Sequence, residues 1–400
     1  MKSCLRRLIG LLIFGAGVGI CGSASISNAA AWEATSSWDE SHEAAYSAWV
    51  EKNWTQDVFK KGPLAGVETD CAEATYSMRA LYAFENHLPF RISDGGHSTW
   101  GENTSAFDQI VAPEKRFRAF LDEVFRRTST ATLPRDTIPI AIARKSLRAG
   151  TIYVEPSVHS YQIVGVSRQG VPTLMSSTVP RKNRILFQTN AFPFYRPRSE
   201  DASDGYRAFR WPEELNKPVT QLSRANQEQY SIAGNVMQFA EQARERLALQ
   251  DESLAERVDR ELTNICYFTQ ERAFMVTNSF VKRLHMAPHC YVGGEKDDHS
   301  TTTRDRVLKD YFVTFRSLRS DPRWPALDES HKQRLMAVFV AGVELDRPDA
   351  LCTVPLGTVS PSMLELHEVW SAIEGNRISS DPNVSILARW GLEAPVSMCK

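Results

Sequence analysis

The sequence has almost no net charge. Over 400 residues, 47 Lys and Arg balance 48 Asp and Glu, which leaves a formal charge of -1. This balance excludes a general electrostatic attraction to nucleic acid or anionic lipid. A phosphate-binding glycine loop, a dinucleotide-binding fingerprint, internal repeats and low-complexity tracts are also missing. The chain is 42% hydrophobic and 24% charged, a globular composition that excludes a disordered, collagen-like or multi-spanning membrane protein.

Long hydrophobic runs are scarce as well. The uncharged run from Leu8 to Cys21 follows a basic start and precedes a stretch of small residues that ends at Ala31. This order is typical of a secretory signal, and the run is shorter than the roughly 20 residues that span a bilayer. We expect cleavage after Ala29 or Ala31, and a periplasmic or secreted protein with no stable membrane span. The alternative is an uncleaved N-terminal anchor.

Cysteine is sparse, and its distribution is uneven. Seven cysteines are too few for a disulfide-dense scaffold, and two of them lie in the predicted signal. Thiols tend to pair in an oxidising compartment, so an odd number leaves at least one thiol unpaired. Cys71 stands alone in the first half and is the expected free thiol. The second half contains the four disulfide candidates, for which we expect the sequential pairs Cys266–Cys290 and Cys352–Cys399.

Hydrophobic spacing divides the chain into helices followed by strands, and then into a mainly helical second half. In the first half we expect helices over about 38–61, 70–85 and 113–127, and strands over 150–154, 158–166, 171–178 and 185–187. Ser37 and Glu40 have the spacing of a capping box for the first helix. In the second half we expect helices over 226–249, 253–263, 271–284, 303–319, 330–343 and 363–374.

This order of elements predicts an α+β fold: a domain with helices and an antiparallel sheet, then a helical domain. The segment 180–218 is rich in Pro, Arg, Ser and Asp, and marks the boundary. We therefore expect a signal peptide over 1–31, an α+β domain over 32–215 and a helical domain with disulfides over 216–400.

The most informative stretch of the sequence surrounds Cys71. Asp70 and Glu73 have the spacing of a helix N-cap and its third residue, which places Cys71 at the first helical position. Unpaired backbone N–H groups and the helix dipole favour a negative charge there, and such a position lowers the pKa of a thiol. A thiolate is the form that attacks a carbonyl. Cys71 is therefore the candidate nucleophile, and a buried, inert thiol is the alternative.

A thiolate nucleophile needs a base that also protonates the leaving group. His159, at the start of an expected strand, is the candidate base, with His97 in a glycine-rich loop as a rival. A third polar group should orient the imidazole. Ser176 and Ser177 end the returning strand and are the candidates for this role. Gln162 is a further option, although strand alternation points it away from His159.

These residues resemble the papain-like fold, and most closely the NlpC-like cell-wall cysteine peptidases and amidases. The resemblance lies in the segment Asp70–Glu73 that opens a helix, the strand 150–154, and His159 followed by a hairpin. It covers about 32–190. The resemblance implies Cys71 as nucleophile, His159 as base and a third residue near Ser176 or Ser177.

The resemblance and the export signal together imply an exported cysteine hydrolase. It would cleave an amide bond through a Cys71 thioester, with peptidoglycan peptides or another peptide as substrate and without a cofactor. A transglutaminase-like acyltransferase on the same fold is one alternative. A binding module that keeps the fold without the chemistry is the other.

Other motifs predict less. His285, His289, Cys290 and the stretch 297–299 contain metal-ligand residue types, but Pro288 interrupts the helix that would align them, so we expect no metal. Basic residues cluster at 181–184 and at 196–198. Such clusters usually belong to the solvated surface of the protein. Binding of an anionic polymer is the alternative.

Overall fold

A computed structural model describes residues 30–94, 98–193, 196–198, 201–286, 289–347, 351–356 and 362–399. Residues 1–29 of the expected signal and the rival base His97 lie outside these ranges. Within them, the chain is a mixture of helices and antiparallel strands followed by a helical region, so the α+β class is confirmed. No helix of the described part is both long and apolar enough to cross a membrane.

Helices dominate the chain before the sheet. They are α1 (Glu40–Asn53), α2 (Cys71–Glu85), α3 (Pro113–Arg127) and the single turn α4 (Leu133–Asp136). The bounds of α3 agree with the prediction. The predicted cap of α1 was wrong by two positions, because Asp39 and not Ser37 accepts the hydrogen bond from the backbone N–H of His42.

The main sheet has six antiparallel strands in the order β3-β8-β4-β5-β6-β7. Two of them were not predicted: β3 lies between the expected helices and strands, and β8 lies in the polar segment that was taken as a boundary. The strands are β3 (Thr137–Pro139), β4 (Ile152–Glu155), β5 (His159–Val166), β6 (Pro172–Ser176), β7 (Phe187–Asn190) and β8 (Gly205–Phe209). A separate hairpin of β1 (Arg91–Ser93) and β2 (Thr99–Gly101) was also not predicted.

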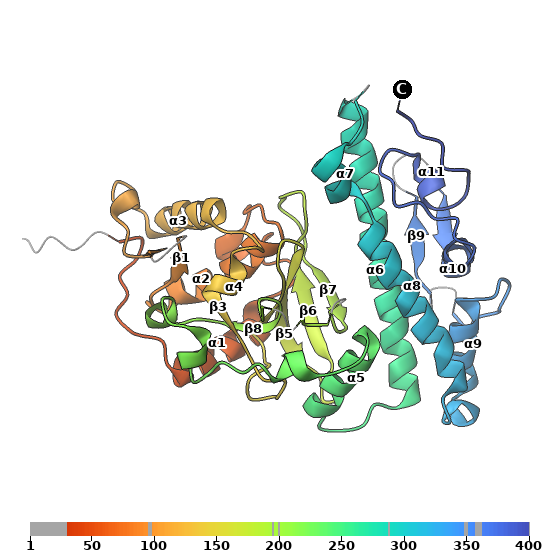
Figure 1. Cartoon of the computed structure of the whole chain (residues 1–400), viewed down its shortest axis with the longest axis horizontal. Helices are drawn as coiled ribbons and strands as arrows, with labels where there is room; N and C mark the ends of the chain where they lie inside the picture. Colours follow the sequence, from red (N-terminus) through yellow and green to blue (C-terminus); the bar gives the residue numbers. More distant parts are fainter. Residues whose placement is uncertain are drawn as a thin grey trace, which may run out of the picture.

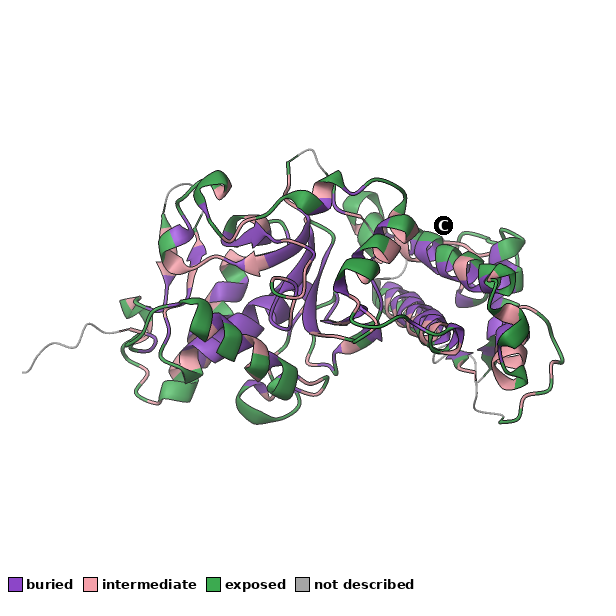
Figure 2. Cartoon of the chain, turned by 90° about the horizontal axis from the view of Figure 1, so that it is seen from below, coloured by how far each residue is buried: buried purple, intermediate pink, exposed green. Residues whose placement is uncertain are grey.

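Each face of the main sheet has its own hydrophobic core. Helices α1 to α3 pack against Ile152, Val154 and Val164 on one face. The opposite face contributes Tyr153 and Tyr161 to a second core, which is completed by α5 (Val236–Leu247). Figure 2 shows buried residues concentrated in the strands and in the helix surfaces that face one another. The sheet is therefore covered on both sides, so the polar side chains of its central strands are buried.

The second half of the chain is built around one long helix. α6 (Leu254–Met286) is continuous, whereas the sequence predicted two shorter helices over the same stretch. Figure 1 shows α6 standing beside β7. The elements that follow α6 are α7 (Gly293–His299), α8 (Thr302–Ser317), α9 (Glu329–Ala337), the hairpin of β9 (Thr353–Pro355) and β10 (Met363–Glu365), α10 (Leu366–Glu374) and α11 (Ile386–Arg389). In Figure 1, α9, α10 and α11 lie on the side of α6 away from the sheet.

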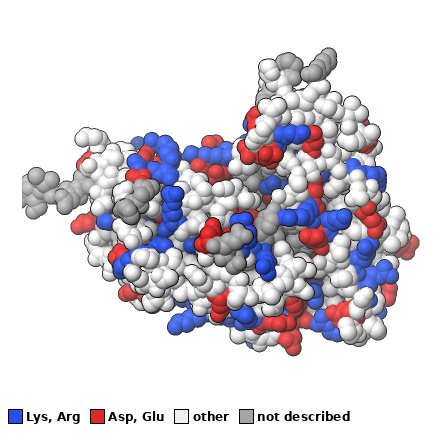
Figure 3. Space-filling model, viewed as in Figure 1, with Lys and Arg blue, Asp and Glu red and all other residues white. Residues whose placement is uncertain are grey.

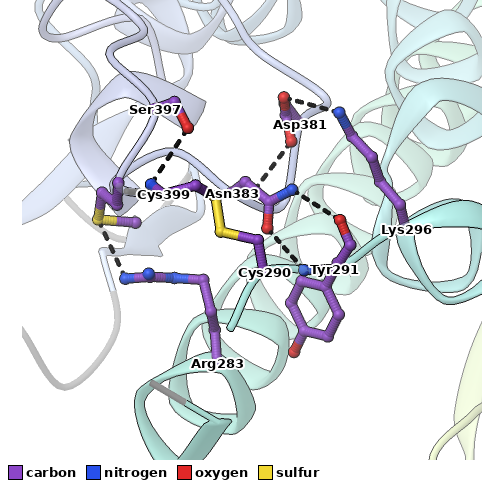
Figure 4. Close-up of a disulfide and its surroundings, with 9 residues drawn as sticks. Arg283, Cys290, Tyr291, Lys296, Asp381, Asn383, Ser397 and Cys399 are labelled. Carbon is purple, nitrogen blue, oxygen red and sulfur yellow. Dashed lines mark hydrogen bonds and ion pairs between the residues drawn. A yellow bond between two sulfur atoms is a disulfide. The ribbon is translucent and has the colours of Figure 1, made fainter. Parts of the chain in front are cut away.

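Two disulfides connect α6 and the segment after it to the last part of the chain. The pairs are Cys266–Cys352 and Cys290–Cys399, with Cα–Cα distances of 5.8 and 5.9 Å. The expected sequential pairing was therefore wrong, because packing on α6 brings residues 86 and 109 positions apart into contact. In Figure 4, Asn383 also bridges to Tyr291, donating a hydrogen bond to its carbonyl and accepting one from its backbone N–H.

Candidate functional site

The first turn of α2 has the predicted cap. The Asp70 carboxylate accepts hydrogen bonds from the backbone N–H groups of Ala72 (3.0 Å) and Glu73 (3.2 Å). The Glu73 carboxylate accepts the Asp70 N–H in return, at 2.8 Å, which completes a capping box. Cys71 is thus fixed as the first residue of the helix.

Cys71 is a free thiol, and its side chain is buried. Its relative exposure is 6%, and the other four described cysteines form the two disulfides. Burial, followed by the negative charge of Asp70, raises the pKa of the Cys71 thiol to about 12. Hydrogen bonding from backbone N–H groups, including those of Ala72 and Ser160, acts in the opposite direction. In this conformation the thiol is protonated near neutral pH.

The polar side chains of β5 that face α2 are Ser160 and Gln162. Ser160 Oγ donates to the Cys71 carbonyl at 2.9 Å, and Gln162 Nε2 donates to Thr75 Oγ1 at 2.7 Å. Thr75 Oγ1 also donates to the Cys71 carbonyl at 2.9 Å. Hydroxyl and amide groups therefore join β5 to the first turn of α2. They hold the backbone around Cys71, and they do not contact the sulfur.

His159 lies on the other face of β5. Successive side chains of a strand point to opposite faces, and the His159 ring packs edge-on against Tyr161 with centroids 4.5 Å apart. Burial, with a smaller contribution from the positive charge of Arg304, lowers the pKa of His159 to about 3. Among the hydrogen bonds of the described residues, none joins the imidazole to the Cys71 thiol. The base role of His159 stays a prediction, and this conformation does not form the expected pair.

The side chains of the two candidate serines, Ser176 and Ser177, point to different sides of the sheet. Ser177 is buried and its hydroxyl donates to the Thr69 carbonyl at 2.9 Å, just before Cys71. Ser176 contacts the Tyr267 hydroxyl of α6 instead. Ser177 therefore belongs to the α2 side of the sheet and Ser176 to the α6 side. Neither is hydrogen-bonded to His159 among the described residues, so their orienting role also stays a prediction.

A buried ionisable cluster on the α6 side was not predicted. Glu155 pairs with His159 across the β4–β5 ladder, and its Oε1 atom has no hydrogen-bond partner in the described structure. Burial, and then the nearby carboxylates of Asp204 and Glu271, raise the pKa of Glu155 to about 8. Arg304 of α8 binds Glu271 at 3.1 Å and extends the cluster. Only tertiary packing brings these residues together, so no local sequence motif predicts the cluster.

The weaker motifs have structural roles. Cys290 is part of a disulfide, and the described residues contain no group of three or more His, Cys, Asp or Glu arranged to hold a metal. In the basic cluster at 181–184, Arg181 pairs with Glu73 and Asp122. Arg184 is buried, which contradicts the expectation of a solvated surface cluster. Figure 3 shows that basic and acidic side chains alternate over the visible face of the molecule, without a large patch of one sign.

Comparison with known proteins adds no relative to this description: no family model, curated protein or solved structure matches the chain.

Proposed function

We propose that the chain is an exported cysteine hydrolase of papain-like architecture, with Cys71 as the nucleophile. The observation that carries the proposal is the position of Cys71: the first residue of a capped helix that packs on an antiparallel sheet. The backbone N–H groups of Ala72 and Ser160 point toward its sulfur. Once the site is hydrated, these groups and the helix dipole favour the thiolate.

The chemistry would be acyl transfer. His159 takes the proton of the Cys71 thiol, and the thiolate attacks an amide carbonyl. The C–N bond then breaks, and the leaving amine takes that proton from the His159 imidazolium. Water then hydrolyses the thioester and releases the acid. The resemblance to cell-wall peptidases and the export signal support peptidoglycan peptides as the substrate.

The described conformation would be a closed form of this enzyme. The thiol is buried and protonated, and His159 is on the far face of β5. His159 directly precedes Ser160, whose N–H points toward the sulfur. The imidazole would therefore reach the thiol if the first residue of β5 left its pairing with Glu155 and turned to the α2 face. Ser157, which has a φ of 60°, is the middle residue of the turn between β4 and β5 and is the place for this rearrangement.

A second candidate function is a binding module without catalysis. Two observations favour it: the raised pKa of the Cys71 thiol, and the lack of a hydrogen bond from the sulfur to an imidazole in the described residues. Such a module would bind cell-wall peptides in place of cleaving them.

Peptidoglycan digestion by the purified chain separates these functions. The hydrolase requires the release of new amine and carboxyl ends, which is lost in Cys71→Ala and falls at least a hundredfold in His159→Gln. Full activity in Cys71→Ala contradicts the proposal. Binding of cell wall without cleavage, unchanged in Cys71→Ala, favours the binding module. An added amine that is incorporated into the product identifies the transglutaminase-like alternative.

A further inference from the structure

The connection between β6 and β7 covers the start of α2. Residues Thr69 and Lys182 form an isolated antiparallel bridge, with N–H to O distances of 3.1 and 3.2 Å. Asn183 Nδ2 donates to the carbonyls of Phe59 (2.6 Å) and Val67 (2.9 Å). These contacts hold the connection in place at Lys182 and Asn183, so the next residue, Arg184, has a defined position.

Arg184 is buried, and its hydrogen-bond donors are only partly used. Its relative exposure is 9%, and its Nη2 atom donates to the Pro180 carbonyl. Its Nε and Nη1 atoms are buried and have no hydrogen-bond partner in the described structure. The guanidinium interacts electrostatically with Asp70 and with Cys71. The guanidinium is therefore close enough to the start of α2 for its charge to act on the thiol.

The neighbouring acid does not satisfy this guanidinium. The Asp70 carboxylate accepts the N–H groups of Ala72 and Glu73 at a single oxygen, Oδ1. No ion pair of Arg184, with Asp70 or with another acid, is found in the described residues. An arginine side chain does not lose its charge in proteins, and buried donors without acceptors are costly. An incoming anion would remove that cost, since carboxylates accept strong charge-assisted hydrogen bonds from arginine.

The ring of Phe274 lies against the guanidinium of Arg184. The guanidinium carbon lies 5.3 Å from the centroid of this ring, which α6 contributes. Phe274 is itself only half-buried and stacks edge-on against Phe187 at 5.6 Å. The Phe274 ring thus lies over the guanidinium and is itself partly exposed to solvent.

We propose that Arg184 binds a carboxylate of the substrate beside the Cys71 sulfur, so that the preferred substrates are peptides with a free carboxylate close to the scissile amide. This assignment rests on the proposed function, because it takes Cys71 as the reacting group. It makes Arg184 a specificity residue that positions the substrate.

Two alkylating reagents that differ only by a carboxylate test the assignment. Iodoacetate and iodoacetamide both form a bond from Cys71 sulfur to carbon and release iodide, while the thiol proton goes to solvent. The ratio of the iodoacetate rate to the iodoacetamide rate should fall about tenfold in Arg184→Gln, the size of one lost charge-assisted hydrogen bond. Arg184→Lys should keep the ratio within about threefold, since it keeps the charge. Arg181→Gln removes a nearby exposed charge and should leave the ratio unchanged. An unchanged ratio in Arg184→Gln overturns the assignment.

A binding measurement keeps the assignment testable whether or not Cys71 is a nucleophile. In Cys71→Ala, N-acetylglycine should raise the melting temperature more than N-acetylglycinamide does at the same ionic strength. The difference should disappear in the double variant with Arg184→Gln. Equal shifts from the two compounds in Cys71→Ala contradict carboxylate binding, while the digestion experiment tests the hydrolase function separately.

Discussion

Glu155 and His159 are direct partners across the β4–β5 ladder, and both are held in their neutral forms. Burial is the main cause for each: it raises the pKa of Glu155 to about 8 and lowers the pKa of His159 to about 3. Near neutral pH the pair is therefore uncharged. Glu271 and Arg304, from the helical half, face the same cluster. The contact between the sheet and the helical half thus depends on a carboxyl group that ionises close to physiological pH.

Replacing this carboxyl group should remove a pH dependence of stability. Glu155 has an ordinary pKa of 4.5 when the chain is unfolded and about 8 when it is folded. Unfolding between these values releases a proton from Glu155, so the contribution of Glu155 to the stability of the folded chain falls as pH rises from about 4.5 to 8. Glu155→Gln should therefore be more stable than the wild type at pH 8, on the order of 3 kcal/mol, with a much smaller gain at pH 5. Urea denaturation at both pH values measures this, and an equal gain at both would contradict it.

The charge of Asp70 should control the reactivity of Cys71. Asn at this position still accepts the cap hydrogen bonds but removes the charge that helps to raise the pKa of the thiol. We expect Asp70→Asn to shift the pH profile of iodoacetamide labelling to lower pH, with labelling about three- to tenfold faster at pH 7. Asp70→Ala also removes the cap, and should lower the stability by about 1 kcal/mol. A labelling profile in Asp70→Asn identical to that of the wild type would argue against this electrostatic coupling.

Shielding by α6 predicts a gain of reactivity from a core substitution. Phe274→Ala removes the ring that covers Arg184, so iodoacetamide should label Cys71 at least about fivefold faster, with a stability loss of about 1–3 kcal/mol. Phe280→Ala is the matched control, because Phe280 is a half-buried residue of the same helix that packs on the helical core. It should lower stability to a similar extent without faster labelling. Equal acceleration in both variants would indicate general loosening of the fold.

The packing of Ala31 favours one of the two expected cleavage positions. Ala31 is 1% exposed and its N–H donates to the Glu102 carbonyl, while Arg116 donates to the Ala30 carbonyl at 3.2 Å. A cut after Ala29 keeps these contacts, whereas a cut after Ala31 removes them. We therefore expect Ala30 as the mature N-terminus, to be read by intact-mass measurement. A chain that starts at Trp32 should be less stable by about 1–2 kcal/mol.

Local signals in the sequence predicted the local parts of this structure. The cap of α2 and the bounds of α3 depend on residues a few positions apart, so both could be read from spacing. β8 could not, because Gly205–Phe209 becomes a strand only by pairing with β3 and β4, which are distant in sequence. The disulfide pairs likewise depend on packing around α6.

The same distinction applies to the candidate site, where local features could be predicted and tertiary packing could not. The position of Cys71 at the helix start was predictable, but the face of β5 that meets α2 was not, since a shift of one residue exchanges the two faces. Packing placed Ser160 and Gln162 on that face and His159 on the other. Arg184 lies in an irregular segment, where no periodicity distinguishes a buried arginine from an exposed one.

The order of the two disulfides along the chain has a consequence for proteolysis. Cys266–Cys352 and Cys290–Cys399 interleave, so the two covalent loops share residues 290–352. A single cut anywhere between Cys266 and Cys399 therefore leaves both fragments joined by at least one bond. Sequential pairs would release a fragment after a cut between Cys290 and Cys352. The helical half is thus held together after any single nick between Cys266 and Cys399, and the fragments should separate on a gel only after reduction.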